Sequence, residues 1–232
     1  MLSKFDVVFF DAGGTLLHPY PSVGEIYEKY CRKHGGDSSA ADLEARFRKA
    51  WIHKDGLGTL RAHANEKVEK QWWRELVEEV FSHEKGIRNF EAFFDELYDI
   101  FALPEYWRLY PQTLDVLKEL KKRGKKMGIV SNWDSRLFKI CEGLGLDQYF
   151  DFIIASAVFG ASKPSPKIFE EALKRSGAKP QQAVHIGDSL EDDIHGAGNV
   201  GIHAILIERH KDHREKAVTD VPVIHSLLDL LK

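Results

Sequence analysis

Short apolar runs and longer amphipathic stretches follow one another along this chain, and their order predicts its architecture. The first run, Phe5–Phe10, is mostly apolar and stops at the glycine-containing segment Asp11–Thr15. A short strand that is apolar on both faces is typical of the middle of a parallel sheet, which helices cover on both sides. We therefore expect a buried first strand that ends in a glycine turn.

A long helical stretch follows, from about Pro19 to about Tyr106. Apolar residues recur there every three or four positions, as on the buried face of a helix. The four stripes are Ile26, Tyr27, Tyr30 and Cys31; Leu43, Phe47, Ala50 and Trp51; Val68, Trp72, Leu76 and Val80; and Phe90, Phe93, Phe94, Leu97, Tyr98 and Phe101. Ser38 or Ser39 and Asn89 are suitable N-caps. Four such helices are enough for a small bundle with its own core.

Beyond Pro111 the chain alternates between helical stripes and short apolar runs. The predicted strands are Met127–Val130, Phe152–Ala155, Ala183–Ile186 and Ile202–Ile207. Strands that alternate with helices of this length predict βαβ units and a parallel sheet. The expected fold class is α/β, with a Rossmann-like parallel sheet and helices on both faces in residues 1–18 and 107–232. An inserted α-helical cap is expected in residues 19–106.

Four polar side chains follow the ends of four predicted strands. Asp11, Ser131 and Asp188 lie just beyond a strand, and Lys163 lies in the loop after the strand around Ile154. The carboxyl ends of the strands form the binding crevice in open α/β sheets, so these groups are expected to converge. Two carboxylates can share Mg²⁺, while a hydroxyl and a lysine can hold phosphate oxygens. The set suits transfer of a phosphoryl group to Asp11.

The segments around these residues are similar to the four motifs of the haloacid dehalogenase (HAD) superfamily. Asp11–Leu16 resembles the first motif, Ile129–Asn132 the second, Lys163–Phe169 the third and Gly187–Ala197 the fourth. They occur in the family's order and span nearly the whole chain. The helical insertion between the first two motifs is similar to the C1 cap of subfamily IA. The resemblance implies a hydrolase with a Rossmann-like core.

The resemblance also implies a metal site. Asp11 would be both the covalent nucleophile and a ligand of Mg²⁺, and Asp188 would be the second carboxylate ligand. The backbone carbonyl of Gly13 would complete the protein ligands. Asp193, or alternatively Asp192, would lie in the outer shell of the metal.

A phosphate-binding set is implied in the same way. Ser131 and the backbone next to it would bind phosphate oxygens, and Lys163 would neutralise charge between the nucleophile and the phosphate. Gly14, Thr15 and Asn132 would complete the contacts to a small phosphorylated substrate.

One position departs from the family pattern. Family phosphatases usually carry a second aspartate two residues after the nucleophile, as general acid and base, and this sequence has Gly13 there. General acid–base help contributes about 10²–10⁴-fold to a rate. Activity would therefore be reduced rather than abolished, unless another group supplies the proton. His18 can do so, or it is only a histidine of the loop or hinge.

Several functions stay open beside the leading one, a magnesium-dependent phosphatase. A haloacid dehalogenase would use Asp11 against carbon and would need no metal. A phosphonate hydrolase would need a reactive lysine from the cap, for which Lys54 is one candidate. A weakly active or purely binding protein would explain Gly13. His185 is expected to be a core residue, and the basic run from Arg209 to Arg214 a solvated loop that can approach the substrate.

Composition narrows these choices further. The 232 residues carry a net charge of −3 with both signs interspersed, and 43% of them are apolar. A nucleic-acid partner would need a clustered basic excess, so none is expected. The two cysteines, Cys31 and Cys141, lie far apart and suit buried free thiols in a reducing compartment. No apolar run approaches the roughly 20 residues that span a bilayer, so we expect a cytoplasmic protein without a membrane partner.

Overall fold

A parallel sheet forms the centre of the structure, a computed structural model that describes residues 1–209 and 220–232. Its strand order in the described residues is β5-β4-β1-β6-β7-β8, so β1 is an interior strand. The strands are β1 (Val7–Phe10), β4 (Lys126–Ser131), β5 (Phe152–Ala155), β6 (Ala183–Gly187), β7 (His203–Ile207) and β8 (Val223–Ile224). All neighbouring pairs are parallel, which confirms the expected α/β sheet.

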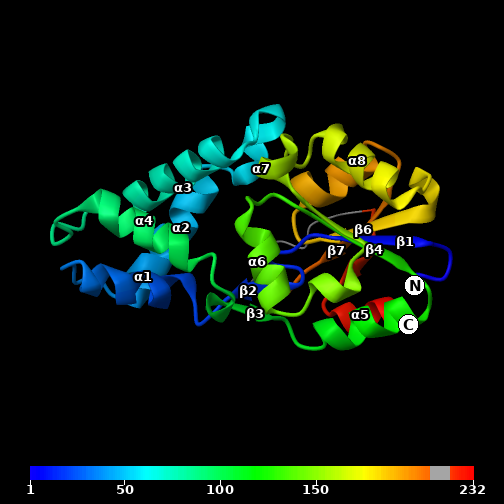
Figure 1. Cartoon of the computed structure of the whole chain (residues 1–232), viewed down its shortest axis with the longest axis horizontal. Coiled ribbons are helices and arrows are strands. Elements are labelled where there is room, and N and C mark those ends of the chain that lie inside the picture. The colour runs from blue at the N-terminus through cyan, green and yellow to red at the C-terminus, as the bar shows by residue number, and fades with distance from the viewer. Residues whose placement is uncertain (210–219) are drawn as a thin grey trace.

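Helices cover both faces of the sheet (Figure 1). Val8 and Phe10 of β1 belong to a buried cluster with side chains of α5 (Thr113–Lys122) and α6 (Arg136–Gly143). Val7 and Phe9 point to the other face, into a cluster with side chains of α8 (Pro166–Ser176). This burial on two sides is why the first strand carries no alternating polar residues.

Four longer helices form the expected bundle between the first strand and the rest of the core. They are α1 (Val23–Lys33), α2 (Ala40–His53), α3 (Glu66–Val80) and α4 (Phe90–Ile100). Ser39 caps α2 through the Asp42 N–H, and Asn89 caps α4 through the Ala92 N–H, which confirms both predicted caps. The bundle has its own apolar core, separate from the two clusters of the sheet.

A short antiparallel ribbon connects the bundle to the core. Its strands are β2 (Leu17–Pro19) and β3 (Trp107–Leu109), the two segments through which the chain leaves and re-enters the core. The apolar pattern did not indicate this pairing, because each strand has only three residues. The ribbon supports our proposal that residues 19–106 form a cap on a core of residues 1–18 and 107–232.

The remaining elements are short. They are η1 (Leu57–His63), η2 (Pro104–Tyr106), η3 (Asp147–Tyr149), α7 (Ser156–Phe159), η4 (Pro180–Gln182), η5 (Leu190–His195), α9 (Gly196–Gly198) and η6 (Leu227–Leu231). The sequence predicts a helix from about Asp134, and the structure has it from Arg136, because side-chain contacts described below hold Asp134 in the preceding loop. Strand β8 was not predicted from the sequence.

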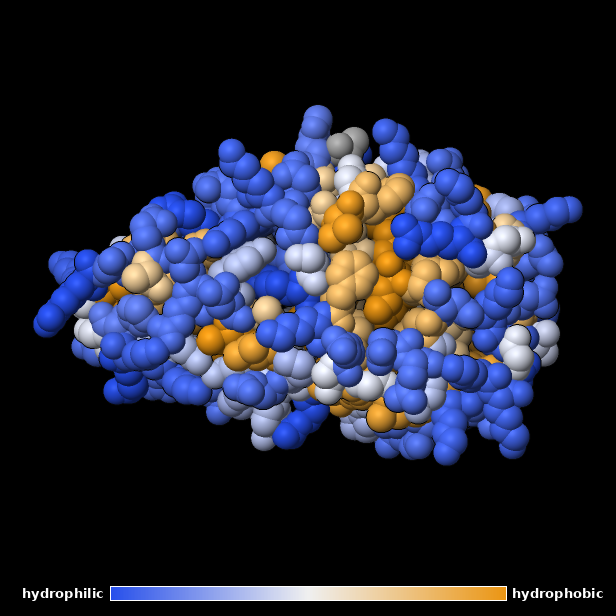
Figure 2. Space-filling model, viewed as in Figure 1, coloured by the Kyte–Doolittle hydropathy of each residue, from blue (hydrophilic) through white to orange (hydrophobic). Residues whose placement is uncertain are grey.

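The surface is mainly hydrophilic on the face shown in Figure 2, with an apolar area on the core side of its junction with the helical bundle. Val158 of α7 is one of the exposed apolar side chains, with 54% of its surface accessible. Cys31 and Cys141 are both buried free thiols, as expected. Among the described residues, no helix is long and apolar enough to cross a membrane.

Candidate active site

The polar groups predicted from the sequence meet at the carboxyl ends of β1, β4 and β6. Asp11 follows β1 and is 6% exposed. The hydroxyl of Ser131, at the end of β4, donates to Asp11 Oδ1 at 2.9 Å. Lys163 Nζ lies 2.6 Å from the same oxygen and 2.5 Å from Asp193 Oδ1. Four chain segments therefore place a hydroxyl, an amine and two carboxylates in direct contact.

Lys163 balances two buried carboxylates at once. Its side chain is 2% exposed. Burial by itself would lower the pKa of Lys163, but the charges of Asp11 and Asp193 raise that pKa above its usual value. Burial raises the pKa of Asp11 despite the opposing charge of Lys163, whereas Lys163 and His185 overcome the effect of burial at Asp193 and lower its pKa. The lysine stays charged, and Asp193 is the carboxylate whose ionised form is better stabilised.

Asp188 brings a third carboxylate to the cluster. One oxygen each from Asp11, Asp188 and Asp193 lies within 4.8 Å of the others. Asp188 reaches the surface, but partial desolvation and the charges of Asp11 and Asp193 raise its pKa well above the usual range. Three carboxylates face one lysine, so the cluster has excess negative charge that a divalent cation can offset.

The turn after β1 is shaped to receive Asp188. Gly14 has a φ of +74°, and a Cβ atom placed on it would lie 2.3 Å from Asp188 Oδ2. Any side chain at this position would therefore displace the Asp188 carboxylate as well as strain the turn. The N–H of Gly14 donates to the Leu17 carbonyl at 3.0 Å, so it already has a partner. The structure thus gives Gly14 a role in the turn, and its contact with substrate stays a prediction.

Asp193 is held from several sides. Its Oδ1 also lies 2.8 Å from His185 Nε2, and its Oδ2 accepts the Ser189 N–H at 3.0 Å. A Cβ on Gly187 would come within 2.1 Å of the Asp193 Cγ, so only glycine leaves room for this carboxylate. Because both Asp193 oxygens have protein partners, Asp193 suits an outer position better than direct metal ligation.

His185 was correctly expected to be buried, but its contact with Asp193 was missed. The sequence feature that could have indicated this contact is an ionisable side chain two residues before Gly187-Asp188, on an otherwise apolar strand.

Asp192 is affected by burial and by the charge of Lys163, which act in opposite directions on its pKa. Burial has the larger effect and raises the pKa of Asp192 to about 7.

Asn132 holds the loop that carries Lys163. Its Oδ1 accepts the Lys163 N–H at 2.7 Å, and its Nδ2 donates to the Lys163 carbonyl at 3.0 Å and to Asp192 Oδ2 at 3.2 Å. Thr15 is fully buried, and its hydroxyl has no hydrogen-bond partner in the described structure. The contacts of Asn132 favour structural support of the Lys163 loop, and the contacts of Asn132 and Thr15 with substrate remain predictions.

Gly13 faces an aromatic ring rather than open space. A Cβ on Gly13 would lie 3.3 Å from Cζ3 of Trp133, whose indole packs 4.8 Å from that of Trp107. His18, the alternative proton donor, contacts the Pro19 carbonyl through Nδ1 at 2.9 Å, and its ring packs against that of Tyr110 at a tilt of 48°. No hydrogen bond in the described part of the chain joins His18 to Asp11. The Trp133 contact could not be predicted, because it joins two loops.

Other sequence candidates lie elsewhere. Lys54 pairs with Glu75 within the helical bundle, at 3.0 Å. In the basic run, residues 210–214 are outside the described residues, and Arg209 donates to the Thr15 carbonyl and stacks on Tyr110. In the part of the chain that the structure describes, neither Lys54 nor Arg209 is hydrogen-bonded to Asp11.

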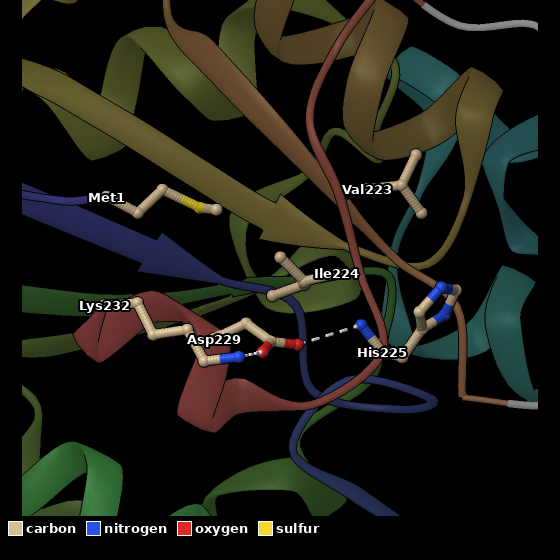
Figure 3. Close-up of a pocket in the computed structure, with 6 residues that line it drawn as sticks. All are labelled: Met1, Val223, Ile224, His225, Asp229 and Lys232. Carbon is tan, nitrogen blue, oxygen red and sulfur yellow. Dashed lines mark hydrogen bonds and ion pairs between the residues drawn. The ribbon is translucent and has the colours of Figure 1, made fainter.

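The described surface has hollows away from and beside the site. One of them, of about 490 Å³, is lined by Met1, Val223, Ile224, His225, Asp229 and Lys232 (Figure 3). It contains none of the catalytic candidates, and its Asp229 is already paired with Lys232. Another, of about 240 Å³, is lined by Asp55, Gly58, Thr59, Arg61, Pro164, Ser189, Glu191 and Asp192. It therefore joins η1 of the bundle to residues beside Lys163 and Asp193.

Comparison with known proteins identifies the family of this chain. The model of haloacid dehalogenase-like hydrolases matches residues 5–201. The chain belongs to this family. This HAD-like hydrolase is 35% identical over 231 residues to haloacid dehalogenase-like hydrolase domain-containing protein 3 of Bos taurus, covering 95% of this chain and 89% of that one. The Gln71–Trp73 segment and the length of the chain indicate the same branch of the family.

Two further relatives carry names that bear on chemistry. The HAD-like chain is 37% identical over 134 residues to a glyceraldehyde 3-phosphate phosphatase of Methanothermobacter thermautotrophicus, covering 53% of this chain and 57% of that one. The crystal structure of a HAD phosphatase from Thermococcus onnurineus superposes with a TM-score of 0.68 at 29% identity, covering 97% of this chain and 96% of the other. These relatives support assignment as a hydrolase.

Proposed function

We propose that this HAD-like hydrolase is a magnesium-dependent phosphatase that acts on a small phosphorylated metabolite through an aspartyl-phosphate at Asp11. The observation that carries the proposal is the contact of Asp11 with Ser131 and Lys163, beside the carboxylates of Asp188 and Asp193. A dehalogenase would have no use for Asp188 as a metal ligand. The names of the two phosphatase relatives support the same choice.

The donor set fits Mg²⁺. Asp11, Asp188 and the Gly13 carbonyl would hold the ion directly, and Asp193 would orient its surroundings from the outer shell. When bound, Mg²⁺ neutralises charge on the phosphate oxygens and on the carboxylates. Burial raises the pKa values of Asp11 and Asp188, and the charge of Asp193 raises both further, so a bound cation would favour the ionised forms of these two carboxyl groups.

The residues of the chain then have distinct tasks. Asp11 attacks phosphorus, and the bond from phosphorus to the leaving oxygen breaks. The Ser131 hydroxyl donates its single proton to Asp11 in this structure, and it would turn that proton to a phosphate oxygen when substrate binds. Lys163 places its positive charge against the nucleophile, where the incoming phosphate adds negative charge. Water then attacks the aspartyl-phosphate and releases inorganic phosphate.

Gly13 indicates which esters react well. It supplies no carboxylate to protonate the leaving oxygen, and the Trp133 ring faces the space beside it. Aryl and acyl phosphates depart with little protonation, whereas alkyl phosphates need it. We therefore propose that this enzyme favours good leaving groups.

A screen of phosphate esters tests the function. Purified protein is incubated with aryl, acyl and alkyl phosphates, with Mg²⁺ or with a chelator, and inorganic phosphate is measured. We expect release that requires Mg²⁺ and is lost in Asp11→Asn and Asp188→Ala. Tyr30→Phe is a matched control, since its hydroxyl contacts Tyr106 inside the helical bundle.

The same preparation separates the rival function. Halide release from 2-haloacids without metal, and no phosphate release from any ester, would replace the phosphatase by a dehalogenase. Phosphate release that survives in Asp11→Asn would remove the aspartyl-phosphate from the mechanism.

A further inference from the structure

The loop that follows Ser131 and Asn132 is tied to the helical bundle as well as to the active site. Asp134, in this loop, is fully buried. Its Oδ2 accepts the hydroxyl of Tyr98, from α4 of the bundle, at 2.7 Å. A cap residue thus contacts the chain three residues beyond the Ser131 hydroxyl that holds Asp11.

Arg136 strengthens this connection. Its Nε lies 2.9 Å from both oxygens of Asp134, and its Nη1 donates to the Tyr98 carbonyl at 2.9 Å. The guanidinium also lies 3.7 Å from the centre of the Tyr98 ring. Tyr98 therefore contacts Asp134 of the loop through its hydroxyl, and it contacts Arg136 at the start of α6 through its ring and its backbone carbonyl. A charged acceptor makes the hydroxyl bond a strong one.

A second contact comes from α3. The Ser135 N–H donates to Glu66 Oε1 at 2.8 Å. On its other side, the loop is fixed to the core by the Trp133 N–H, which donates to the Ser156 hydroxyl at 3.0 Å. Movement of the bundle away from the core would break the bonds of Tyr98 and Glu66 but would leave those of Ser156.

We propose that Tyr98 and Asp134 are positioning residues, whose hydrogen bond lets the closed cap hold the loop of Ser131 and Asn132 against Asp11 and Lys163. This rests on the proposed phosphatase function. Neither residue is assigned contact with the substrate. Closure would thereby order the hydroxyl that fixes the nucleophile, and it would also order the amide that clamps the Lys163 backbone.

Tyr98→Phe tests the proposal, because it removes the hydroxyl and keeps the ring under Arg136. We expect kcat/KM for phosphate esters to fall about tenfold, as for loss of a hydrogen bond to a charged acceptor. Amide hydrogen exchange in peptides that cover residues 131–137 should become faster. Tyr30→Phe removes a comparable buried hydroxyl from the bundle, and it should change neither measurement.

A double-variant cycle separates positioning from general destabilisation. Tyr98→Phe should have little further effect on kcat/KM in an Asp134→Ala background, since the acceptor is already gone. If Asp134→Ala does not fold, Asp134→Asn serves, with a reduced effect of Tyr98→Phe because the acceptor has lost its charge.

The outcomes are distinct. Unchanged exchange at residues 131–137 in Tyr98→Phe, or effects equal to those of Tyr30→Phe, would overturn the proposal. If the wild-type protein releases no phosphate from any ester, the proposed function fails, and the exchange comparison still decides whether Tyr98 holds the loop.

Discussion

Two buried carboxyl groups, one in the crevice and one where the bundle meets the core, have opposite properties. Asp193 and Glu69 are 1% and 0% exposed. Asp193 contacts Lys163, His185 and the Ser189 N–H, and its pKa is lowered despite burial. The Glu69 oxygens have no hydrogen-bond partner among the described residues, and burial raises the pKa of Glu69 to about 8.

The surroundings of Glu69 explain the difference. Asp134 adds to the effect of burial, and Arg136 opposes it only in part because Arg136 is already paired with Asp134. Glu66 on the same helix also raises the pKa, while the Ser156 hydroxyl of α7 lowers it slightly. Burial alone therefore does not determine charge. The charge of Lys163 keeps Asp193 ionised, whereas Glu69 has no such cation of its own and stays protonated at neutral pH.

Replacing Lys163, the positively charged side chain of the crevice, should cause the largest change in stability. Lys163→Met leaves Asp11 and Asp193 without their shared partner, and we expect the free energy of unfolding to fall by about 3–5 kcal/mol at pH 8. At pH 5 the loss should be smaller, because the carboxyl groups can take up protons. Denaturant unfolding without added metal measures both values. A loss below about 1 kcal/mol at pH 8 would mean that the pairing contributes little beyond packing.

Adding a carboxylate to the crevice is the second test. Gly13→Asp supplies the missing acid–base group, so alkyl-phosphate turnover should rise about tenfold to a thousandfold. The Trp133 ring has to shift by a few tenths of an ångström, so Gly13→Asp with Trp133→Ala should gain more than Gly13→Asp alone. Steady-state rates with aryl and alkyl esters measure the gain. No gain in a folded, magnesium-binding variant would indicate that another residue already supplies the proton.

Replacing Glu69 by a neutral residue should have an intermediate effect, which is on the pH dependence of stability. The folded protein keeps the Glu69 proton up to about pH 8, while the unfolded chain releases it near the ordinary glutamate value, so stability falls as the pH rises through this window. Glu69→Gln should remove a decrease of about 2 kcal/mol in unfolding free energy between pH 6 and pH 8. Glu78→Gln, at an exposed position of the same helix, should keep the wild-type slope. Equal slopes in wild type and Glu69→Gln would show that Glu69 ionises without penalty in the fold.

The smallest effect is expected where water screens the charges. Arg32 pairs with Glu28 on α1 at 2.7 Å, and 60% of the Arg32 side chain is exposed. Arg32→Gln should leave the free energy of unfolding almost unchanged, as for other exposed helix pairs. Thermal unfolding at low and high salt measures it. A loss comparable to that of Lys163→Met would mean that exposure does not separate the two kinds of pair.

Local patterns in the sequence predicted much of this molecule. The strand Phe152–Ala155 begins and ends where it was predicted. The strand before Asp11 begins two residues later than predicted, and the strand that ends at Ser131 is one residue longer at each end. Asp11, Ser131, Lys163 and the acidic segment after β6 come together as expected, because parallel strands end at the same edge of the sheet.

Contacts between distant segments were not predictable in the same way. The pairing of β2 with β3, the Trp133 ring beside Gly13 and the Tyr98–Asp134 bond each join segments that lie far apart in the sequence. Glu69 left a weak signal, since it lies four residues before Trp73 and thus on an apolar side of its helix. A polar residue at such a position indicates burial, but its partners come from other elements.

The interior position of β1 has a consequence for synthesis of the chain. Val7 pairs with Lys126 on one side and with Ala183 on the other, so both neighbours of the first strand are made long after it. The helical bundle, with its own core, lies between β1 and β4 and emerges from the ribosome before either neighbour. The bundle can therefore be folded while the strand that precedes Asp11 still lacks its partners, and the exposed apolar segment Val7–Phe10 is where a chaperone would have most to protect.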